Sequence, residues 1–349
     1  MNEKIRILID RLESARSLTV SEYEELINAF DPESAAYAAE RAVLLRQSVY
    51  GNDVYIRGLV EIGNVCKNDC IYCGIRRSNK NCDRYRLTKE QIISCCRAGY
   101  ELGFRTFVFQ GGEGGVATVE FICDLVAQVK SEYPDCAVTL SLGEYSRKDY
   151  EAMFNAGADR YLLRHETANK EHYEMLHPAE MSYENRMRCL YDLRDIGFQV
   201  GCGFMVGSPY QTSAHLANDL KFIEEFSPDM CGIGPFIPHK DTPFGEMPAG
   251  QVDLTLYLLS LIRLIKPNIL LPATTALGSL QQNGRERGIL AGANVVMPNL
   301  SPVDVRDKYA LYDNKLSVGA ESAEGMRALA ERMKGIGYNI VTARGDIKK

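Results

Sequence analysis

From residue 54 onward the sequence alternates short apolar runs with amphipathic stretches. Helical periodicity fills the intervals between the runs, for example over residues 88–103 and 118–133. Because parallel strands need a long crossover between them, this alternation predicts parallel βα units. Eight such units with right-handed crossovers predict an α/β chain folded as a closed (βα)8 TIM-type barrel. The predicted strands cover residues 55–63, 104–110, 136–142, 159–164, 198–207, 229–234, 268–273 and 293–298.

The segments before and after the predicted barrel lack its alternation of short apolar runs and amphipathic stretches. The first fifty residues are predicted to be helical, with SEYE at Ser21–Glu24 as a capping box and a strong helix over residues 33–47. We expect one more helix near the C-terminus, and no linker or low-complexity stretch divides the chain. The prediction is therefore one domain over residues 1–349, comprising a helical extension at 1–50, the barrel at 54–300 and a C-terminal extension at 301–349.

The charge and the apolar content argue against several classes of protein. The net charge is −6 and the pI is about 5.6, unlike a protein that neutralises nucleic acid phosphates. No apolar stretch approaches the length of a membrane span, and the N-terminus MNEKIRILIDRLE is too charged for a signal peptide. Eleven cysteines make a poor disulfide framework and are expected to stay reduced. We expect a cytoplasmic protein that binds neither nucleic acid nor a membrane.

Residues 66–73, CKNDCIYC, place three cysteines directly after the first predicted strand. In a barrel, active sites are built at this end of the strands. A structural zinc site needs four ligands, for which Cys82 is the nearby candidate, and buried inert thiols are another possibility. A [4Fe–4S] cluster explains the number three, because one iron then stays open for a substrate. We favour such a cluster, held by Cys66, Cys70 and Cys73.

The spacing C-x3-C-x2-C, with Tyr72 before the last cysteine, resembles the radical S-adenosylmethionine (SAM) superfamily. Residues 110–113, QGGE, end the second predicted strand and match the GGE motif of that superfamily. The resemblance implies one oxygen-sensitive [4Fe–4S] cluster, with SAM chelated to its open iron and cleaved reductively to a 5′-deoxyadenosyl radical. The residues expected to hold SAM are Tyr72, Gln110, Gly111, Gly112, Glu113, Arg164, Glu166 and Arg186.

Two of these residues have specific expected contacts with SAM. Glu166 follows the fourth predicted strand, where it could accept hydrogen bonds from ribose hydroxyls. Arg186 could pair with the methionine carboxylate through its planar fork of donors. The glycines of the GGE motif would let backbone carbonyls approach the ammonium group of the ligand.

Five further segments follow one another along the predicted barrel: VTLSLGE (138–144), DRYLLRHETAN (159–169), GIGPFIPHKDTP (232–243), LPATTALGS (271–279) and GANVVMPNLSP (292–302). Together they resemble the HydE family of radical maturases, which help to assemble the active-site cluster of [FeFe]-hydrogenase. The similarity runs from about Arg57 to Tyr312. It implies a small organometallic substrate, a cysteine-ligated iron precursor bearing carbon monoxide and cyanide. It also implies transient contacts with other hydrogenase maturases and with an electron donor.

An anionic, compact substrate of this kind requires hydroxyl and guanidinium donors inside a closed cavity. Polar residues on or just after the predicted strands could supply these donors, and by alternation Thr139 and Ser141 share one face of their strand. By resemblance, Met297, Asn299, Tyr309 and Tyr312 would close the cavity near the eighth strand. The predicted donors are Arg57, Thr139, Ser141, Arg160, Thr274 and Thr275.

Three alternatives remain open on sequence grounds. Methylornithine synthase and biotin synthase share the barrel and the cysteine loop, and Cys123 and Cys202 could be mistaken for ligands of a biotin-synthase-type second cluster. A lysine-derived substrate would favour carboxylates in the lumen, where arginines and hydroxyls are predicted instead. The non-enzymatic alternative is an iron–sulfur or zinc scaffold. Some relatives carry a second cysteine group near the C-terminus, but the last cysteine here is Cys231, so one cluster is expected.

Overall fold

The computed structural model describes residues 1–317 and 322–349, and its centre is a closed barrel of parallel strands. Six strands follow one another in the order β2-β3-β4-β5-β6-β8, and β10 pairs with β1, the strand that continues into β2. Bridges from Met230 to Leu270 and from Pro272 to Val295 close the ring. The predicted barrel is therefore confirmed. The strand bounds are β1 Asp53–Ile56, β2 Gly58–Gly63, β3 Thr106–Gly111, β4 Ala137–Ser141, β5 Arg160–Leu162, β6 Gln199–Cys202, β7 Met205–Val206, β8 Met230–Cys231, β9 Gly234–Pro235, β10 Val295–Val296 and β11 Asn339–Val341.

Several predicted strands are shorter than expected or interrupted. Residues 268–273 form only the two bridges that close the ring. The predicted strand 198–207 divides into β6 and β7, because Gly203 between them has a φ of 154°. A side chain there would meet the carbonyl oxygen of Gly232, on the neighbouring strand pair, at 2.1 Å. Glycine thus allows the two strand pairs β6–β7 and β8–β9 to approach closely where they bend.

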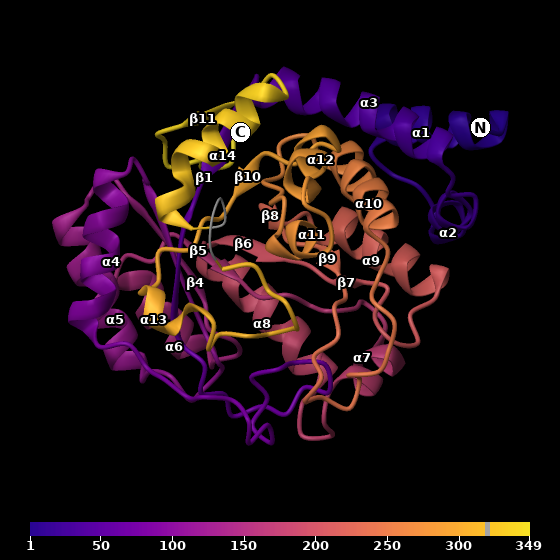
Figure 1. The fold of residues 1–349 in the computed structure, drawn as a ribbon. Coiled ribbons are helices and arrows are strands. Elements are labelled where there is room, and N and C mark those ends of the chain that lie inside the picture. The colour runs from indigo at the N-terminus through magenta and orange to yellow at the C-terminus, as the bar shows by residue number, and fades with distance from the viewer. Residues whose placement is uncertain (318–321) are drawn as a thin grey trace.

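Helices cover the outside of the barrel in alternation with the strands (Figure 1). Inward and outward side chains alternate, so Phe107 and Phe109 of β3 pack in the apolar layer under the helices while Gln110 faces the lumen. The helix bounds are α4 Lys89–Glu101, α5 Val119–Glu132, α6 Arg147–Asn155, α7 Lys170–Leu176, α8 Tyr183–Ile196, α9 Ser213–Phe226, α10 Val252–Ile265, α11 Thr275–Leu280 and α12 Gly284–Leu290.

The N-terminal extension is helical as predicted, and its helices pack against the outer helices, α3 on α10 and α2 on α9. The predicted capping box at Ser21–Glu24 is wrong. The residue that caps α2 is Thr19, whose side chain accepts from the backbone of Glu22, and the Glu22 carboxylate reaches back to Thr19. Ser21 already lies inside the helix. The bounds are α1 Glu3–Ala15, α2 Val20–Asn28 and α3 Pro32–Tyr50.

The C-terminal extension contains the expected helix and also returns to the barrel. Its helical elements are α13 Val303–Arg306, the 3-10 turn Ala323–Gly325 and α14 Met326–Gly335. β11 then pairs in parallel with β1. The tail crosses the N-terminal ends of the strands, where the carbonyl oxygen of Arg344 accepts hydrogen bonds from Thr106 and Arg160 at 2.7 and 3.0 Å. We call this end of the barrel, formed by Thr106, Arg160, Gln199 and the tail residues Arg344 and Asp346, the floor.

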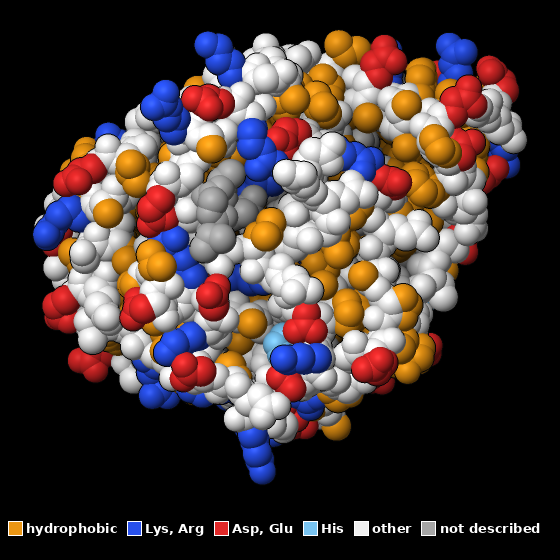
Figure 2. Space-filling view, viewed as in Figure 1, with side chains coloured by type: hydrophobic (Ala, Val, Ile, Leu, Met, Phe, Trp, Pro, Cys, Tyr) orange, Lys and Arg blue, Asp and Glu red, His pale blue; other side chains and the backbone are white. Residues whose placement is uncertain are grey.

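The surface carries acidic and basic side chains close together. Figure 2 shows both signs interspersed over one face, with no large area of a single sign. None of the helices in the described residues combines the length and the apolar content that crossing a membrane requires. The division of the chain into one domain with the boundaries given above stays a prediction.

Candidate active site

A cavity of about 370 Å³ opens at the C-terminal ends of the strands, opposite the floor. We call this end the mouth. Its walls come from the cysteine loop after β2, the ends of β3 to β5, the β8–β9 region and the segment around Tyr309. Seventeen residues predicted from the sequence line it: Cys66, Cys70, Tyr72, Cys73, Gln110, Gly111, Gly112, Glu113, Ser141, Arg164, Glu166, Arg186, Thr274, Thr275, Met297, Tyr309 and Tyr312.

The cysteine loop is held in shape by its own polar residues. Asp69 accepts two hydrogen bonds from Arg76, both at 2.8 Å, and further bonds from Ser78. These bonds hold the pKa of the Asp69 carboxyl well below its usual range. The backbone amide of Lys67 donates to the carbonyl of Glu113 at 2.8 Å, so the loop is also fixed to the end of β3.

Burial makes the three loop thiols poor acids in the absence of a cation. It raises the pKa of Cys73 to about 12, and it raises the pKa values of Cys66 and Cys70 as well. Iron would supply the positive charge that stabilises the thiolates. In the described residues no three side chains of the His, Cys, Asp or Glu type converge on one possible metal position. A [4Fe–4S] cluster bonds each thiolate to a different iron and needs no such common point.

The GGE motif packs directly under the cysteine loop. A side chain at Gly112 would lie 2.2 Å from the carbonyl oxygen of Val65, and the amide of Gly112 donates to Gly63. Cys66 and Gly114 form an antiparallel bridge. Close approach of the loop backbone is therefore a sufficient reason for glycine at position 112, in addition to the expected approach of a ligand.

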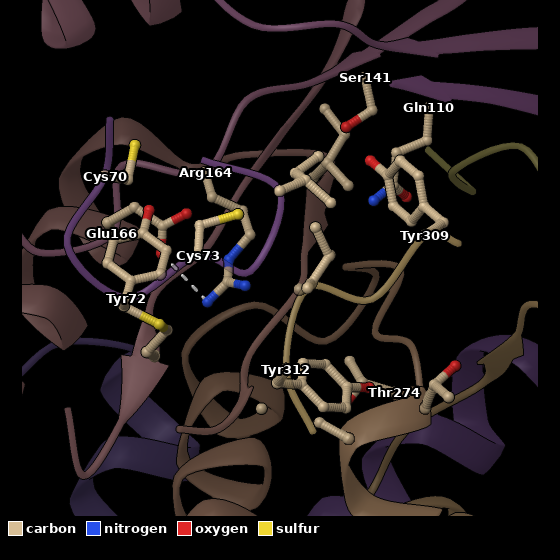
Figure 3. A pocket seen from close by; sticks show the side chains of 18 of the residues that line it. Cys70, Tyr72, Cys73, Gln110, Ser141, Arg164, Glu166, Thr274, Tyr309 and Tyr312 are labelled. Atoms are coloured by element: carbon tan, nitrogen blue, oxygen red, sulfur yellow. Dashed lines mark ion pairs between the residues drawn. The ribbon is translucent and has the colours of Figure 1, made fainter. Parts of the chain in front are cut away.

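Arg164 and Glu166 carry buried polar atoms without hydrogen-bond partners. Arg164 Nη2 lies 3.3 Å from Glu166 Oε2, close enough to attract but not aligned as a hydrogen bond, and Arg164 Nε is also unpartnered. Figure 3 shows both side chains facing the cavity beside Cys73 and Tyr72. Buried polar atoms in folded proteins normally have partners, so these atoms fit a polar ligand such as SAM.

A buried His–Asp pair fixes the backbone on both sides of Glu166, which has a left-handed φ of 67°. His165 Nδ1 accepts from the amide of Gly203 at 3.3 Å, which leaves Nε2 to donate to Asp219 Oδ1 at 3.2 Å. The same oxygen accepts from the amide of Ala168 at 2.6 Å. Sequence analysis missed this pair, because Asp219 lies on α9, 54 residues away from His165.

Arg186 and Tyr72 are also held from behind by protein groups. Arg186 donates through Nε to Glu144 and through Nη1 to the carbonyl of Arg164, both at 2.6 Å. Tyr72 makes an edge contact with the ring of His177, whose Nε2 lies 3.3 Å from the tyrosine hydroxyl. His177 Nδ1 lies 2.9 Å from the carbonyl of Tyr173, so Nδ1 carries the proton and Nε2 accepts from Tyr72.

Four predicted substrate residues do not line the cavity. Arg160 is committed to the floor, where it pairs with Asp346 and donates to Thr106. Arg57 and Thr139 lie buried in the barrel, and Arg57 Nε, Arg57 Nη2 and Thr139 Oγ1 have no hydrogen-bond partner. Asn299 lies behind the cavity wall and donates to Glu61 at 2.9 Å. Their role in binding a substrate stays a prediction, and for Arg160 the complete set of partners argues against it.

Two charged residues that sequence analysis missed do line the cavity, Glu61 on β2 and Lys315 after α13. A signal for Glu61 was available, because it is a carboxylate inside the apolar strand GLVEIG and shares a face with Leu59, which also points into the lumen. Lys315 follows α13 in an irregular segment, where no periodicity indicates which way a side chain points.

The two cysteines considered for a second cluster do not face the lumen. Cys123 lies on the outer helix α5, partly buried. In β6, positions 199 and 201 face the lumen, so Cys202 points to the opposite side of the strand. There it packs beside Cys231 in the core under the helices. The arrangement offers no ligands for a biotin-synthase-type cluster among these residues.

A sequence profile of the Radical SAM superfamily matches residues 60–223. The [FeFe] hydrogenase maturase subunit HydE of Thermotoga maritima is 46% identical over 274 residues, which is 78% of each chain. The 3-methylornithine synthase of Methanosarcina acetivorans is 26% identical over 84% of this chain and 82% of its own.

Solved structures share the fold. The crystal structure of methylornithine synthase (PylB) superposes with a TM-score of 0.84 at 24% identity, covering 96% of this chain and 97% of that one. HydG, a maturase of the [FeFe]-hydrogenase, superposes with a TM-score of 0.79 at 19% identity, covering 96% of this chain and 75% of that one. At these identities the likeness concerns the barrel and its extensions.

Proposed function

The chain belongs to the HydE family of radical SAM enzymes, and from that membership we propose that it helps to build the active-site cluster of an [FeFe]-hydrogenase. The observation that carries the proposal is the 46% identity to HydE across 78% of both chains. The segments that resemble that family supply residues on several sides of the cavity, including Ser141, Arg164, Thr274 and Met297. These segments therefore contribute to the space where a substrate would bind.

We assign the cofactors to the residues of the mouth. Cys66, Cys70 and Cys73 would hold one [4Fe–4S] cluster, and Arg164, Glu166 and Arg186 would bind SAM beside it. When bound, this pair of cofactors supplies one-electron reduction of the sulfonium and a 5′-deoxyadenosyl radical. The chain's own residues fix the geometry. Arg186 presents a guanidinium already oriented by Glu144, and Glu166 is held in place by the amide contacts of its neighbours.

For the substrate we propose a cysteine-ligated iron precursor bearing carbon monoxide and cyanide, with the radical directed at its cysteine sulfur. Thr274 Oγ1 is buried without a partner on the cavity wall and can donate to an anionic ligand. Thr275 and Ser141 line the same space. Leu59, Leu162 and Phe236 form an apolar part of the wall. Fixed orientation of the reacting groups supplies much of the rate in reactions of this type.

The test is restoration of hydrogenase activity in a host that lacks its own radical maturase of this type. The wild-type chain should restore activity, whereas Cys73→Ala should not. With the purified enzyme, a synthetic iron–cysteine precursor should increase the release of 5′-deoxyadenosine under reduction. A chain that carries its cluster, fails to rescue and converts lysine to methylornithine would contradict the proposal. Contacts with other maturases and an electron donor belong to the same proposal and would appear as co-purification from an anaerobic host.

A further inference from the structure

Glu61 and Lys315 form a desolvated ion pair inside the cavity. Their side chains are 1% and 10% exposed, and Lys315 Nζ contacts Glu61 Oε1. Asn299 Nδ2 donates to the other oxygen, Oε2, at 2.9 Å. Both carboxylate oxygens of Glu61 are therefore occupied by groups of the protein itself.

Lys315 keeps donor capacity for a ligand. Besides Glu61, its ammonium group donates to the carbonyl of Tyr309 at 3.0 Å and lies 4.9 Å from the centre of the Tyr309 ring. An ammonium has three protons, and these contacts use two of them. Within residues 1–317 and 322–349 these are the acceptors of its hydrogen bonds, and since Lys315 lines the cavity, the third proton can be donated to a bound anion.

The pair stands apart from the charges that we assign to SAM. Figure 3 places Tyr309, whose carbonyl Lys315 contacts, on the side of the cavity away from Arg164, Glu166, Cys70 and Cys73. The other charged residues of the cavity wall are Glu113, Arg164, Glu166 and Arg186, next to the cysteine loop. Within the described lining, Glu61 and Lys315 are thus the charged groups beside Tyr309.

We propose that this pair determines the sign of the charge that the substrate end accepts. Lys315 neutralises Glu61, so an ammonium-bearing ligand meets a carboxylate whose charge is already compensated, while an anionic ligand can accept the remaining Lys315 proton. In a poorly solvated cavity such a difference in charge is strongly discriminating. The inference rests on the proposed function for the identity of the anion, but the discrimination itself follows from the pair.

Lys315→Met tests the inference because it removes the ammonium and keeps an apolar stem of similar length. We expect binding of the anionic iron–cysteine precursor to weaken about tenfold or more, since one charge-assisted hydrogen bond is lost. Binding of L-lysine should strengthen by a similar factor, because Glu61 is exposed to the ligand. Both affinities are measured by anaerobic titration of the reconstituted, SAM-saturated full chain.

Glu61→Gln and the double variant Glu61→Gln/Lys315→Met complete the comparison. Glu61→Gln should bind the precursor at least as tightly as wild type, and the double variant should lose the gain in lysine affinity. Thermal unfolding and iron content identify any variant that fails to fold. If Lys315 only fastens the segment around Tyr309, Lys315→Met weakens both ligands alike, and that result would overturn the inference.

The outcomes separate this inference from the proposed function. A wild-type enzyme that does not bind the precursor would contradict the proposed substrate. If Lys315→Met still gains lysine affinity and the double variant does not, the charge discrimination stands without that substrate. If the wild type binds the precursor and rescues hydrogenase activity, while all three variants keep the wild-type preference, the charge discrimination is wrong and the proposed function stands.

Discussion

Arg160 and Arg164 lie four residues apart at opposite ends of β5, and their surroundings differ completely. At the floor, Arg160 is fully buried and donates to Gln199, Thr106 and the tail, including Asp346. At the mouth, Arg164 Nε has no hydrogen-bond partner, and neither does the Glu166 oxygen nearest to this arginine. A buried polar group with a complete set of partners stabilises the fold, whereas one without partners costs free energy unless a ligand supplies them.

For these two arginines, the partners and not the residue type distinguish a structural role from a candidate functional one. Arg57 is the intermediate case, since its Nη1 contacts the Met230 sulfur at 2.9 Å while Nε and Nη2 have no hydrogen-bond partner. Variants at the mouth should therefore lose the cluster or SAM cleavage and keep the free energy of unfolding. Variants at the floor should lower the free energy of unfolding and keep the cluster and SAM cleavage.

The largest effect is expected for Cys73→Ala at the mouth. Loss of one thiolate should abolish the normal cluster and all release of 5′-deoxyadenosine, because the expected cluster has only three protein ligands. Wild-type protein reconstituted without oxygen should contain about four irons per chain. Iron analysis and EPR measure the cluster, and chromatography measures 5′-deoxyadenosine. Zinc in place of iron would contradict the assignment, as would about six irons, which require a second cluster.

At the floor, Asp346→Ala should lower the free energy of unfolding by about 2 kcal/mol. Breaking a buried pair costs several kcal/mol, and the value is reduced because Asp346 is 37% exposed. The matched control is Asp195→Ala, an acidic residue of α8 that is 58% exposed and lies 4.0 Å from Arg194. The cluster and SAM cleavage should persist in Asp346→Ala, and their loss at unchanged stability would contradict the division between the two ends.

The same ion pair predicts a pH dependence. Its positive partners lower the pKa of Asp346 to about 2 from an ordinary value of 3.8, although burial opposes the shift. A lowered carboxyl pKa means that the stabilisation is fully present above about pH 4 and is lost as the pH falls through about 2. The difference in unfolding free energy between wild type and Asp346→Asn should therefore be constant above pH 4 and shrink below it. A difference that grows on acidification would disprove the ion-pair account.

Arg186→Lys should have a smaller effect and confine it to SAM. A lysine keeps the positive charge but loses the planar fork, so SAM affinity should weaken by about tenfold while the cluster persists. Titration followed by EPR measures the affinity. Arg188→Lys, an exposed position on the same helix, is the control. Unchanged affinity in Arg186→Lys would remove this residue from the site.

The contrast between mouth and floor also explains what the sequence could predict. The barrel and the cysteine loop rest on local patterns, namely apolar periodicity and the spacing of three cysteines within eight residues. The floor depends on the tail segment RGDIK, which has no pattern of its own and acquires a role only by reaching Arg160. The Glu61–Lys315 pair joins residues 254 positions apart, and no local rule indicates it. From residue type alone, Arg57 and Arg160 were both predicted to donate to the substrate. In the structure Arg160 donates to partners within the protein, whereas two nitrogen atoms of Arg57 have no hydrogen-bond partner.

The smallest effect on stability is expected for Arg57→Met combined with Thr139→Val. This double variant also tests the buried part of the barrel between the floor and the mouth. Burial lowers the pKa of Arg57, and both side chains contain unpartnered polar atoms, so apolar replacements should leave the free energy of unfolding unchanged or raise it by about 1 kcal/mol. If these donors serve a ligand below the cavity, the variant should still cleave SAM but no longer rescue hydrogenase activity. Chemical unfolding, 5′-deoxyadenosine release and the rescue assay measure the three quantities. If the variant rescues fully and is more stable, the unpartnered atoms only destabilise the fold and bind no ligand. The functional region would then be restricted to the mouth.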